Sequence, residues 1–297
     1  MNFGIIGLGR IGGNLSLQAI EKGHQVVGYS KSDKELNNLE SKGLDPADSV
    51  RKLVKKLSPP RIVFLYIPHG NPTEEVCEEI KQYLENGDIL IDGGNSHWKK
   101  SVCRYEEFRK LGIHFLDCGT SGGIEGAHSG ACFMVGGDVE AYSTVEPIFR
   151  DLAVPEGFMH VGPAGAGHFT KLIHNAIEFG MLQAIGEGVA LLQASDYKLN
   201  LPQLMHNWSH GSVIRSWLIE LMGQGLLENK LETLSDYVED TREVRWAIEY
   251  ALEKEVWIPV ISQAELALYR SRDSENISAK AVAMMRNGFG GHPLHKK

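Results

Sequence analysis

Several kinds of segment are missing from this chain, and each absence excludes a class of protein. The 297 residues include no basic tail and the formal net charge is −8, so we expect neither nucleic acid nor an anionic membrane surface as a partner. No run of about 18 apolar residues is present to cross a bilayer. The first residues lack the charged, apolar and cleavage regions of a signal peptide, so we expect a cytoplasmic protein.

Cysteine is scarce, and its spacing matches no metal or disulfide pattern. No two of the four cysteines form a C-x-x-C pair: Cys77, Cys103, Cys118 and Cys132. We therefore expect reduced thiols rather than a zinc site or a disulfide framework. His206 and His210 are one helical turn apart, but no third ligand accompanies them, so we expect no metal.

The first half of the chain alternates short apolar runs with amphipathic segments. We predict strands over 2–8, 25–29, 61–67, 88–91 and 113–117, and helices over 11–22, 33–42, 73–85 and 99–110. A further strand over 131–135 and a helix over 138–150 follow. This order predicts an α/β Rossmann-type domain over residues 1–160, with a doubly wound parallel sheet covered by helices on both faces.

The pattern changes after about residue 160. Apolar positions recur at helical spacing from 164 to 193 with little turn punctuation, which predicts one long helix. More helices are expected at about 201–208, 212–227, 242–254, 257–272 and 278–287. The sequence therefore predicts a second, all-α domain over residues 161–297 for substrate binding and dimerisation.

A Gly-rich turn connects the first expected strand to the first expected helix. It runs Gly7-Leu8-Gly9-Arg10-Ile11-Gly12 and has the G-x-G-x-x-G spacing of a dinucleotide-binding turn. Gly7 permits the tight turn, Gly9 lets the backbone approach a pyrophosphate, and Gly12 permits close packing of helix and strand. The helix N-terminus supplies unpaired N–H groups and positive dipole to the phosphates. We expect a nicotinamide cofactor here.

The end of the second expected strand indicates which nicotinamide cofactor is preferred. An acidic residue there would bond the ribose 2′-OH of NAD and repel the 2′-phosphate of NADP. This chain has Ser30, Lys31 and Ser32 instead, with no carboxylate before Asp33. Two hydroxyls and a cation favour a 2′-phosphate, so we expect NADP rather than NAD.

Three polar stretches follow the expected strands. Residues 92–96 and 119–123 are rich in Gly and short polar side chains, and they lie where open α/β sheets bind ligands. In the long helix, polar side chains fall at i, i+3, i+4 and i+7 to form one stripe: Lys171, His174, Asn175 and Glu178. Such a stripe faces either water or a cleft, and here it follows the expected domain junction, where pockets form.

These motifs together resemble 6-phosphogluconate dehydrogenase over essentially the whole chain. The matching pieces are the Gly7–Gly12 turn, Ile91–Ser96, Ser121–Gly123, Lys171-x-x-His174-Asn175-x-x-Glu178, Trp208–Ser216 and Arg286–His292. The wider β-hydroxyacid dehydrogenase superfamily shares the Ser-Gly-Gly turn and a Lys-x-x-x-Asn, but not the pair His174 and Glu178. The chain resembles the short form of the family, which has one helical unit.

The resemblance implies the oxidative decarboxylation of 6-phosphogluconate to ribulose 5-phosphate and CO2, a step of the pentose phosphate pathway. By position, Lys171 is similar to the general base that takes the proton from the C3 hydroxyl. Glu178 is similar to the general acid that protonates C1 after CO2 leaves. A base must be deprotonated before it accepts a proton, so a buried lysine suits this role.

The resemblance also assigns binding residues. Its substrate contacts are Asn95, Ser121, Gly122, Gly123, His174 and Asn175, with Arg270 on the phosphate, because a guanidinium suits a phosphate oxyanion. To the cofactor site we assign the Gly-rich turn, Ser30–Ser32, Tyr66, Ile67, Pro68 and Asn95. In the long form, an Arg and a His of the tail reach the neighbouring subunit's substrate. Arg286 and His292 match them, so we expect a homodimer or homotetramer with tail exchange.

The chain departs from the family pattern at two places. Phe179 stands where the family has a Tyr that bonds the substrate phosphate, and residues 241–246 match a Lys-rich family segment only loosely, although Arg242 is a possible substitute. Two alternatives remain open. One is a 3-hydroxyacid dehydrogenase of the same superfamily acting on a small non-phosphorylated acid, which would need fewer cations. The other is a non-catalytic NADP-binding sensor, which would not need Lys171 and Glu178.

Overall fold

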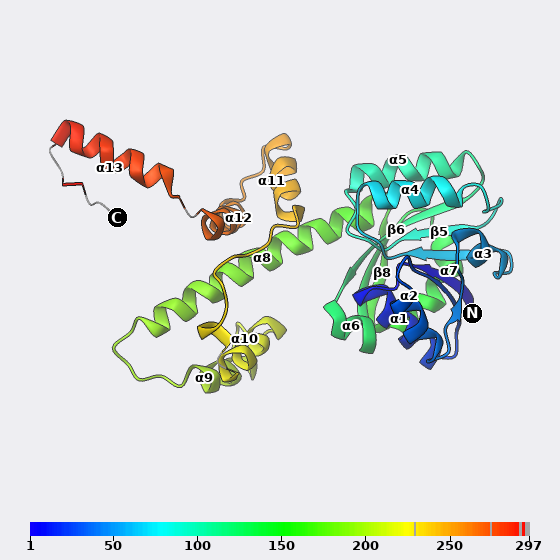
Figure 1. Ribbon diagram of the computed structural model, residues 1–297, viewed down its shortest axis with the longest axis horizontal. Coiled ribbons are helices and arrows are strands. Elements are labelled where there is room, and N and C mark those ends of the chain that lie inside the picture. Colours follow the sequence, from blue (N-terminus) through cyan, green and yellow to red (C-terminus); the bar gives the residue numbers. More distant parts are fainter. Residues whose placement is uncertain (229, 274, 291–292, 295–297) are drawn as a thin grey trace. The chain divides into compact units, whose positions relative to one another are not determined.

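The computed structural model describes residues 1–228, 230–273, 275–290 and 293–294. The chain divides into two compact units, Met1–His174 and Asn175–Lys297, and each is described separately (Figure 1). The division falls inside a helix that continues from the first unit into the second. Across the described ranges, no helix combines the length and apolar character needed to cross a membrane.

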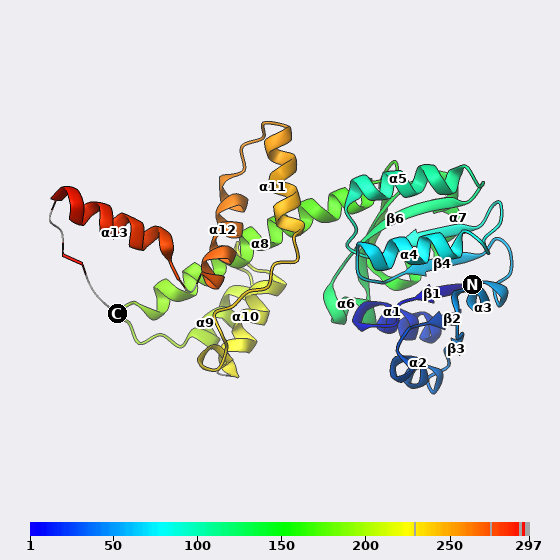
Figure 2. The same ribbon diagram turned by 45° about the horizontal axis from the view of Figure 1, so that its top comes forward.

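The first unit is built on one eight-stranded sheet. Its strands are β1 (Asn2–Ile6), β2 (Gln25–Tyr29), β3 (Asp45–Pro46), β4 (Ile62–Leu65), β5 (Ile89–Asp92), β6 (His114–Ser121), β7 (Ala131–Gly136) and β8 (Ala153–Gly162). They lie in the order β3-β2-β1-β4-β5-β6-β7-β8 (Figures 1 and 2). The strand order reverses between β1 and β4, and in open α/β sheets such a switch point forms the ligand crevice.

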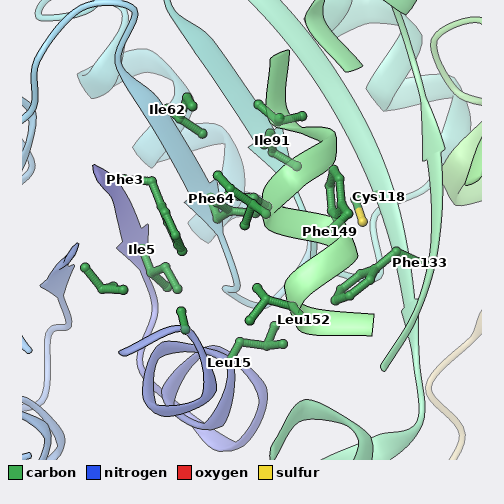
Figure 3. Packing of buried hydrophobic residues seen from close by; sticks show 14 of the residues in the cluster. Phe3, Ile5, Leu15, Ile62, Phe64, Ile91, Cys118, Phe133, Phe149 and Leu152 are labelled. Atoms are coloured by element: carbon green, nitrogen blue, oxygen red, sulfur yellow. The ribbon is translucent and has the colours of Figure 1, made fainter. Parts of the chain in front are cut away.

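Helices cover both faces of this sheet. They are α1 (Arg10–Glu21), α2 (Asp33–Glu40), α3 (Val50–Lys55), α4 (Asn71–Ile80), α5 (Trp98–Arg109), α6 (Gly123–Ser129) and α7 (Val139–Leu152). Strand side chains alternate between the two faces. Phe3, Phe64 and Phe149 belong to the core under α1, α6 and α7, which Figure 3 shows. Val63 and Phe115 belong to the core under α3, α4 and α5.

The fold class predicted from the sequence is confirmed, with one correction to the strand directions. β7 runs antiparallel to β6, whereas every other neighbouring pair in the sheet is parallel. The connection from β6 to β7 contains only residues 122–130, which is too short for the crossover that a parallel pair requires. The longer connection through α7 restores the parallel direction for β8.

Four elements of the first unit escaped the sequence prediction, and one strand is longer than predicted. β3 has two residues, α3 has six, α6 has seven, and β8 contains Pro155 and Gly157, which usually mark a turn. β8 lies at the sheet edge and its register with β7 is irregular, which is where Pro is tolerated. The predicted strand over 113–117 continues to Ser121, so residues 119–121 are part of β6 rather than a loop after it.

The second unit contains only helices among its described residues. The long helix α8 (Ala166–Gln193) enters it and is followed by α9 (Leu201–Ser209), α10 (Trp217–Leu227), a 3-10 turn (Lys230–Glu232), α11 (Glu243–Glu253), α12 (Pro259–Arg272) and α13 (Ile277–Gly290). Val189, Met205 and Ile219 join α8, α9 and α10 in a small apolar core. The prediction of one long helix followed by shorter ones is confirmed.

Candidate active site

The Gly-rich turn lies between β1 and α1, at the switch point of the sheet. Gly7 has φ +95°, a left-handed conformation that an L side chain rarely adopts. A Cβ on Gly12 would overlap the carbonyl oxygen of Gly7, so no larger residue fits where α1 leaves the strand. The turn therefore depends on glycine at both ends.

The middle of the turn fits a phosphate group. No heavy atom lies within 4 Å of the position that a Cβ on Gly9 would occupy, so the backbone is open to a ligand there. Gly9 also provides no side-chain cap to α1, and no acidic residue occupies the first turn of that helix. The N–H groups and positive end of α1 are consequently available to an anion, without a competing carboxylate in that turn.

The residues after β4 border this turn. The Tyr66 N–H donates to the Ile6 carbonyl (2.8 Å), and a Cβ on Gly7 would overlap the Tyr66 carbonyl oxygen. The Tyr66 hydroxyl bonds Thr120 Oγ1 (3.2 Å), which ties the end of β4 to the end of β6. Burial raises the pKa of Tyr66 well above its usual value, so its hydroxyl keeps its proton. Tyr66–Pro68 therefore line the same sheet edge as the Gly-rich turn.

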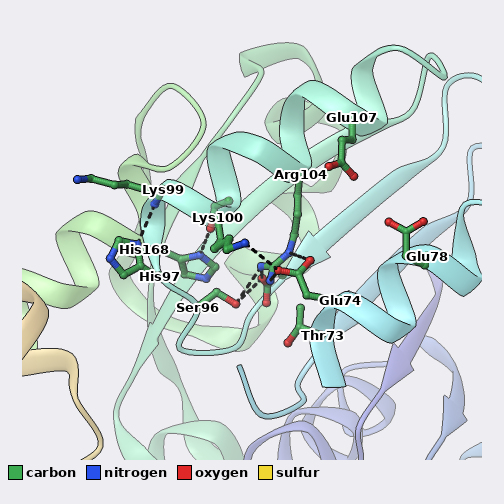
Figure 4. A network of polar contacts seen from close by, with 12 residues as sticks. Thr73, Glu74, Glu78, Ser96, His97, Lys99, Lys100, Arg104, Glu107 and His168 are labelled. Atoms are coloured by element: carbon green, nitrogen blue, oxygen red, sulfur yellow. Dashed lines mark hydrogen bonds and ion pairs between the residues drawn. The ribbon is translucent and has the colours of Figure 1, made fainter. Parts of the chain in front are cut away.

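A buried ion pair holds the loop that presents Asn95. The Asp92 carboxylate, at the end of β5, accepts hydrogen bonds from Ser96 Oγ (2.7 Å), the Gly94 N–H (3.1 Å) and Arg104 NH1 (2.9 Å). Arg104 also bonds Glu74 of α4, and its side chain is only 4% exposed (Figure 4). These bonds hold the loop in place, while Asn95 in the same loop is exposed.

Asp117 of β6 determines where α8 begins. Its fully buried carboxylate accepts hydrogen bonds from the Gly165 N–H (2.6 Å) and the His168 N–H (2.7 Å), which satisfies the first turn of the helix. The His168 ring bonds Ser101 Oγ of α5 through Nδ1 at 2.7 Å (Figure 4). The first turn of α8 is thereby attached to both a strand and a helix of the first unit.

The next two side-chain positions on the same face of β6 meet α8 further along. A Cβ on Gly119 would overlap Lys171 Cβ and would lie 2.9 Å from the carbonyl oxygen of Gly167. Ser121 Oγ and His174 Nε2 are 3.1 Å apart, and His174 Nδ1 is 3.5 Å from Lys171 Nζ. Alternate residues of β6 thus contact successive turns of α8 and bring Ser121, His174 and Lys171 into one hydrogen-bonded cluster.

The polar stripe of α8 is not a solvated face. Lys171 and Asn175 are each only 8% exposed, and His174 and Glu178 are half-buried. By contrast, the apolar Ile177 on the same helix is 52% exposed. Burial of the polar side of a helix is the arrangement expected of residues that line a cleft.

The remaining sequence-predicted residues lie in several places. Gly122 (φ +115°) and Gly123 begin α6 directly after Ser121. In the second unit, Arg270 is exposed in the last turn of α12 beside Asp273, and Arg286 is exposed on α13. His292 lies outside the described residues. No group of three potential metal ligands occurs among the His, Cys, Asp and Glu residues that the structure describes.

The sequence prediction missed the residues that position this cluster. Asp92 and Asp117 stand in apolar strands, and Arg104 and His168 lie within helices. A charged residue in a strand buried on both faces was the available signal, because a buried charge requires a partner. The partner itself cannot be named from spacing alone, since Arg104 comes from a different element.

A Gly-rich turn lies at the switch point of a mostly parallel sheet, and Lys171 lies buried on the helix that follows the last strand. Together these features define a nicotinamide-dinucleotide oxidoreductase. Two family models specify it further. One, described as the NAD binding domain of 6-phosphogluconate dehydrogenase, matches residues 2–162, and another, described as the 6-phosphogluconate dehydrogenase C-terminal domain, matches residues 192–297. The chain belongs to the 6-phosphogluconate dehydrogenase family.

Relatives of similar length align over both whole chains. YqeC of Bacillus subtilis, provisionally named a 6-phosphogluconate dehydrogenase, is 43% identical over 100% of each chain. The NAD(+)-dependent decarboxylating 6-phosphogluconate dehydrogenase of Haloferax volcanii is 37% identical over 100% of this chain and 99% of its own.

A solved structure supports the same assignment. The 6-phosphogluconate dehydrogenase of Plasmodium falciparum superposes with a TM-score of 0.85 and 26% identity over 100% of this chain. Only 66% of the Plasmodium chain is covered, so this chain spans about two thirds of that longer enzyme. The resemblance to the short form of the family is confirmed.

Proposed function

We propose that this protein oxidises and decarboxylates 6-phosphogluconate to ribulose 5-phosphate and CO2, with reduction of NAD or NADP. The observation that carries the proposal is the Ser121–His174–Lys171 cluster, built on the framework of this family. The named relatives act on 6-phosphogluconate. The buried stripe of α8 provides the residues that such a reaction requires.

The bound nicotinamide supplies one step, the acceptance of a hydride from C3. The residues of this chain handle the protons. Lys171, which is only 8% exposed, takes the proton of the C3 hydroxyl as the neutral amine. The resulting 3-keto acid loses CO2, because its carbonyl accepts the electron pair of the breaking C1–C2 bond. Lys171, now an ammonium, hydrogen-bonds the enolate oxygen that forms.

Lys171 gives its proton to the enolate oxygen, which yields the enediol. Glu178 then gives a proton to C1 of the ribulose 5-phosphate enediol, the carbon that was C2 of 6-phosphogluconate, while Lys171 takes back the proton of the neighbouring hydroxyl. Glu178 lies seven residues after Lys171 on α8, which is about two turns along the same side of the helix. Ser121 and His174 bond one another and so hold hydroxyl and imidazole groups beside the base. Asn95 and Asn175 add amide groups suited to the sugar hydroxyls. Arg270 pairs with the substrate phosphate in this proposal.

The tail is the remaining part of the proposed site. Arg286, on α13, is expected to act on the substrate of a second copy of the chain, so activity requires at least a dimer. Mixing Lys171→Met subunits with Arg286→Ala subunits tests this exchange. Each parent should be inactive, whereas the mixed oligomer should recover part of the activity. No recovery in a mixed oligomer would contradict tail exchange.

The activity itself is tested with purified protein, 6-phosphogluconate and either cofactor. Reduced nicotinamide is followed by its near-ultraviolet absorbance, and CO2 release is measured in the same reaction. We expect equal amounts of both products. Turnover of 3-hydroxyisobutyrate in place of 6-phosphogluconate would instead support the small-acid alternative, whose representatives share the fold. No turnover of either substrate would contradict both enzymatic functions and support the non-catalytic dinucleotide-binding sensor.

The role of Lys171 has its own test. Lys171→Met should lower kcat by about 10² or more while the protein stays folded, as expected when a general base is lost. Lys171→Arg should not restore kcat, because a guanidinium keeps its charge and cannot act as a base. Lys42→Met, at an exposed position, is the matched control. Near-normal kcat in Lys171→Met would remove this residue from the mechanism.

A further inference from the structure

The end of β2 carries a carboxylate that the Ser30-Lys31-Ser32 pattern does not reveal. Ser30, the residue after β2, donates its hydroxyl proton to Glu35 Oε2 at 2.8 Å. Glu35 lies in the first turn of α2 and is half-buried. The other oxygen of this carboxylate, Oε1, remains for a further donor. The hydroxyl expected to meet a phosphate is therefore already engaged by an acid.

An ordinary capping role does not account for this contact. Ser32 caps α2 by accepting the Glu35 N–H (3.4 Å), so Ser32 and Glu35 have the spacing of a capping box. In such a box, the Glu side chain would accept the N–H of the capping residue itself. Here the Ser32 N–H donates to Ser30 Oγ instead (3.2 Å). The Glu35 carboxylate is turned toward the end of β2 rather than toward the helix cap.

This position is adjacent to the Gly-rich turn. The Gly7 N–H donates to the Tyr29 carbonyl at 2.9 Å, and Ile6 is paired with Tyr29 across β1 and β2. Glu35 also follows the turn by about 20 residues, the usual separation of the acidic residue that bonds the cofactor ribose. Its carboxylate thus lies where dinucleotide-binding folds place the residue that contacts the 2′ position of the cofactor ribose.

The nearby cations do not offset this carboxylate. Lys31 Nζ lies 3.8 Å from Glu75 Oε2 of α4, so the lysine expected to bind a 2′-phosphate already has an acidic neighbour. Both side chains are largely exposed, which keeps this pair weak but still lowers the positive potential at the end of β2. Arg10, in the Gly-rich turn, is the other cation to consider.

We propose that Glu35 determines cofactor selection and makes this protein prefer NAD. The carboxylate accepts a hydrogen bond from the ribose 2′-OH of NAD and repels the 2′-phosphate of NADP. This inference rests on the proposed dinucleotide function, and it opposes the NADP preference expected from Ser30, Lys31 and Ser32. It does not depend on which hydroxy acid is oxidised.

Equilibrium binding of NAD and of NADP tests the proposal by titration calorimetry without any sugar phosphate. The test therefore stands even if 6-phosphogluconate is not the substrate. We expect the wild type to bind NAD about 10-fold or more tightly than NADP. Glu35→Gln should move the ratio of dissociation constants toward NADP by about 10-fold, or about 1.4 kcal/mol. Asp33→Asn, which removes the same charge from the same helical turn, is the matched control and should move the ratio less.

Ionic strength gives a second measurement. Added salt screens exposed charges, so it should narrow the wild-type discrimination against NADP and have little effect on the ratio in Glu35→Gln. Four results would overturn the proposal. The first three are tighter wild-type binding of NADP than of NAD, equal shifts in Glu35→Gln and Asp33→Asn, or no binding of either dinucleotide. The fourth is a loss of NADP binding alone in Arg10→Ala, which would assign selection to Arg10.

Discussion

Gly119→Ala should impair catalysis more than it impairs folding. Gly119 lies on β6 where α8 packs directly against the strand. A Cβ at this position would overlap Lys171 Cβ and would lie 2.9 Å from the Gly167 carbonyl oxygen. The space under Lys171 therefore exists only because residue 119 has no side chain.

The magnitude follows from the size of this overlap. Carbon atoms in contact prefer a separation of about 3.5–4.0 Å, so the helix must move on the order of 1 Å to accommodate the new methyl group. Overpacking of this kind typically costs about 1–3 kcal/mol of stability. A displacement of about 1 Å in a catalytic group can lower the rate by about 10². We therefore expect kcat to fall by about that factor in a protein that still folds.

Steady-state kinetics and cofactor binding test this prediction together. The dissociation constant for NAD should stay close to that of the wild type, because the Gly-rich turn belongs to β1 and α1. Gly225→Ala is the matched control, since no heavy atom lies within 4 Å of the Cβ it would add. Unchanged kcat in Gly119→Ala, or an equal loss of kcat and NAD affinity, would refute the reasoning.

Two further predictions concern stability. Arg104→Met should destabilise the fold by about 3–5 kcal/mol in urea unfolding, because it leaves the buried Asp92 carboxylate without its cation. Adding Asp92→Asn should recover part of that loss, and a double variant less stable than Arg104→Met would contradict this account. Burial, followed by the nearby N-terminal ammonium, lowers the pKa of His24 from 6.5, so the folded state favours the neutral ring. Wild-type stability should therefore fall as the pH drops below about 6.5, where the unfolded chain binds the proton first, and His24→Gln should show a weaker dependence.

Much of the fold was predictable because its strands are buried on both faces. Apolar runs such as the one ending at Leu65 differ clearly from the amphipathic helices between them, and this contrast located six strands of the sheet. The end of β6 was not predictable in the same way. Residues 119–121 are Gly, Thr and Ser, and they extend the strand only because β7 pairs with them. Tertiary pairing outweighs local preference there.

The candidate site shows the same limit for side chains. Helical spacing placed Lys171, His174 and Glu178 on one side of α8, because a helix fixes which residues share a face. The direction of the Glu35 side chain follows no such period. Its carboxylate turns back past the helix cap to Ser30, and only the folded chain places this acidic group at the end of β2.

The way α8 is held also bears on the proposed chemistry. A general base alternates between amine and ammonium, so a contact that depended on its charge would change strength during each turnover. The backbone and packing contacts next to Lys171 do not involve its charge. Asp117 bonds two backbone N–H groups, and Gly119 and Gly167 bring strand and helix together by direct packing. The backbone beside the lysine is therefore expected to stay in place whether Nζ carries a proton or not, and the contact between Lys171 Nζ and His174 Nδ1 is one that must adjust.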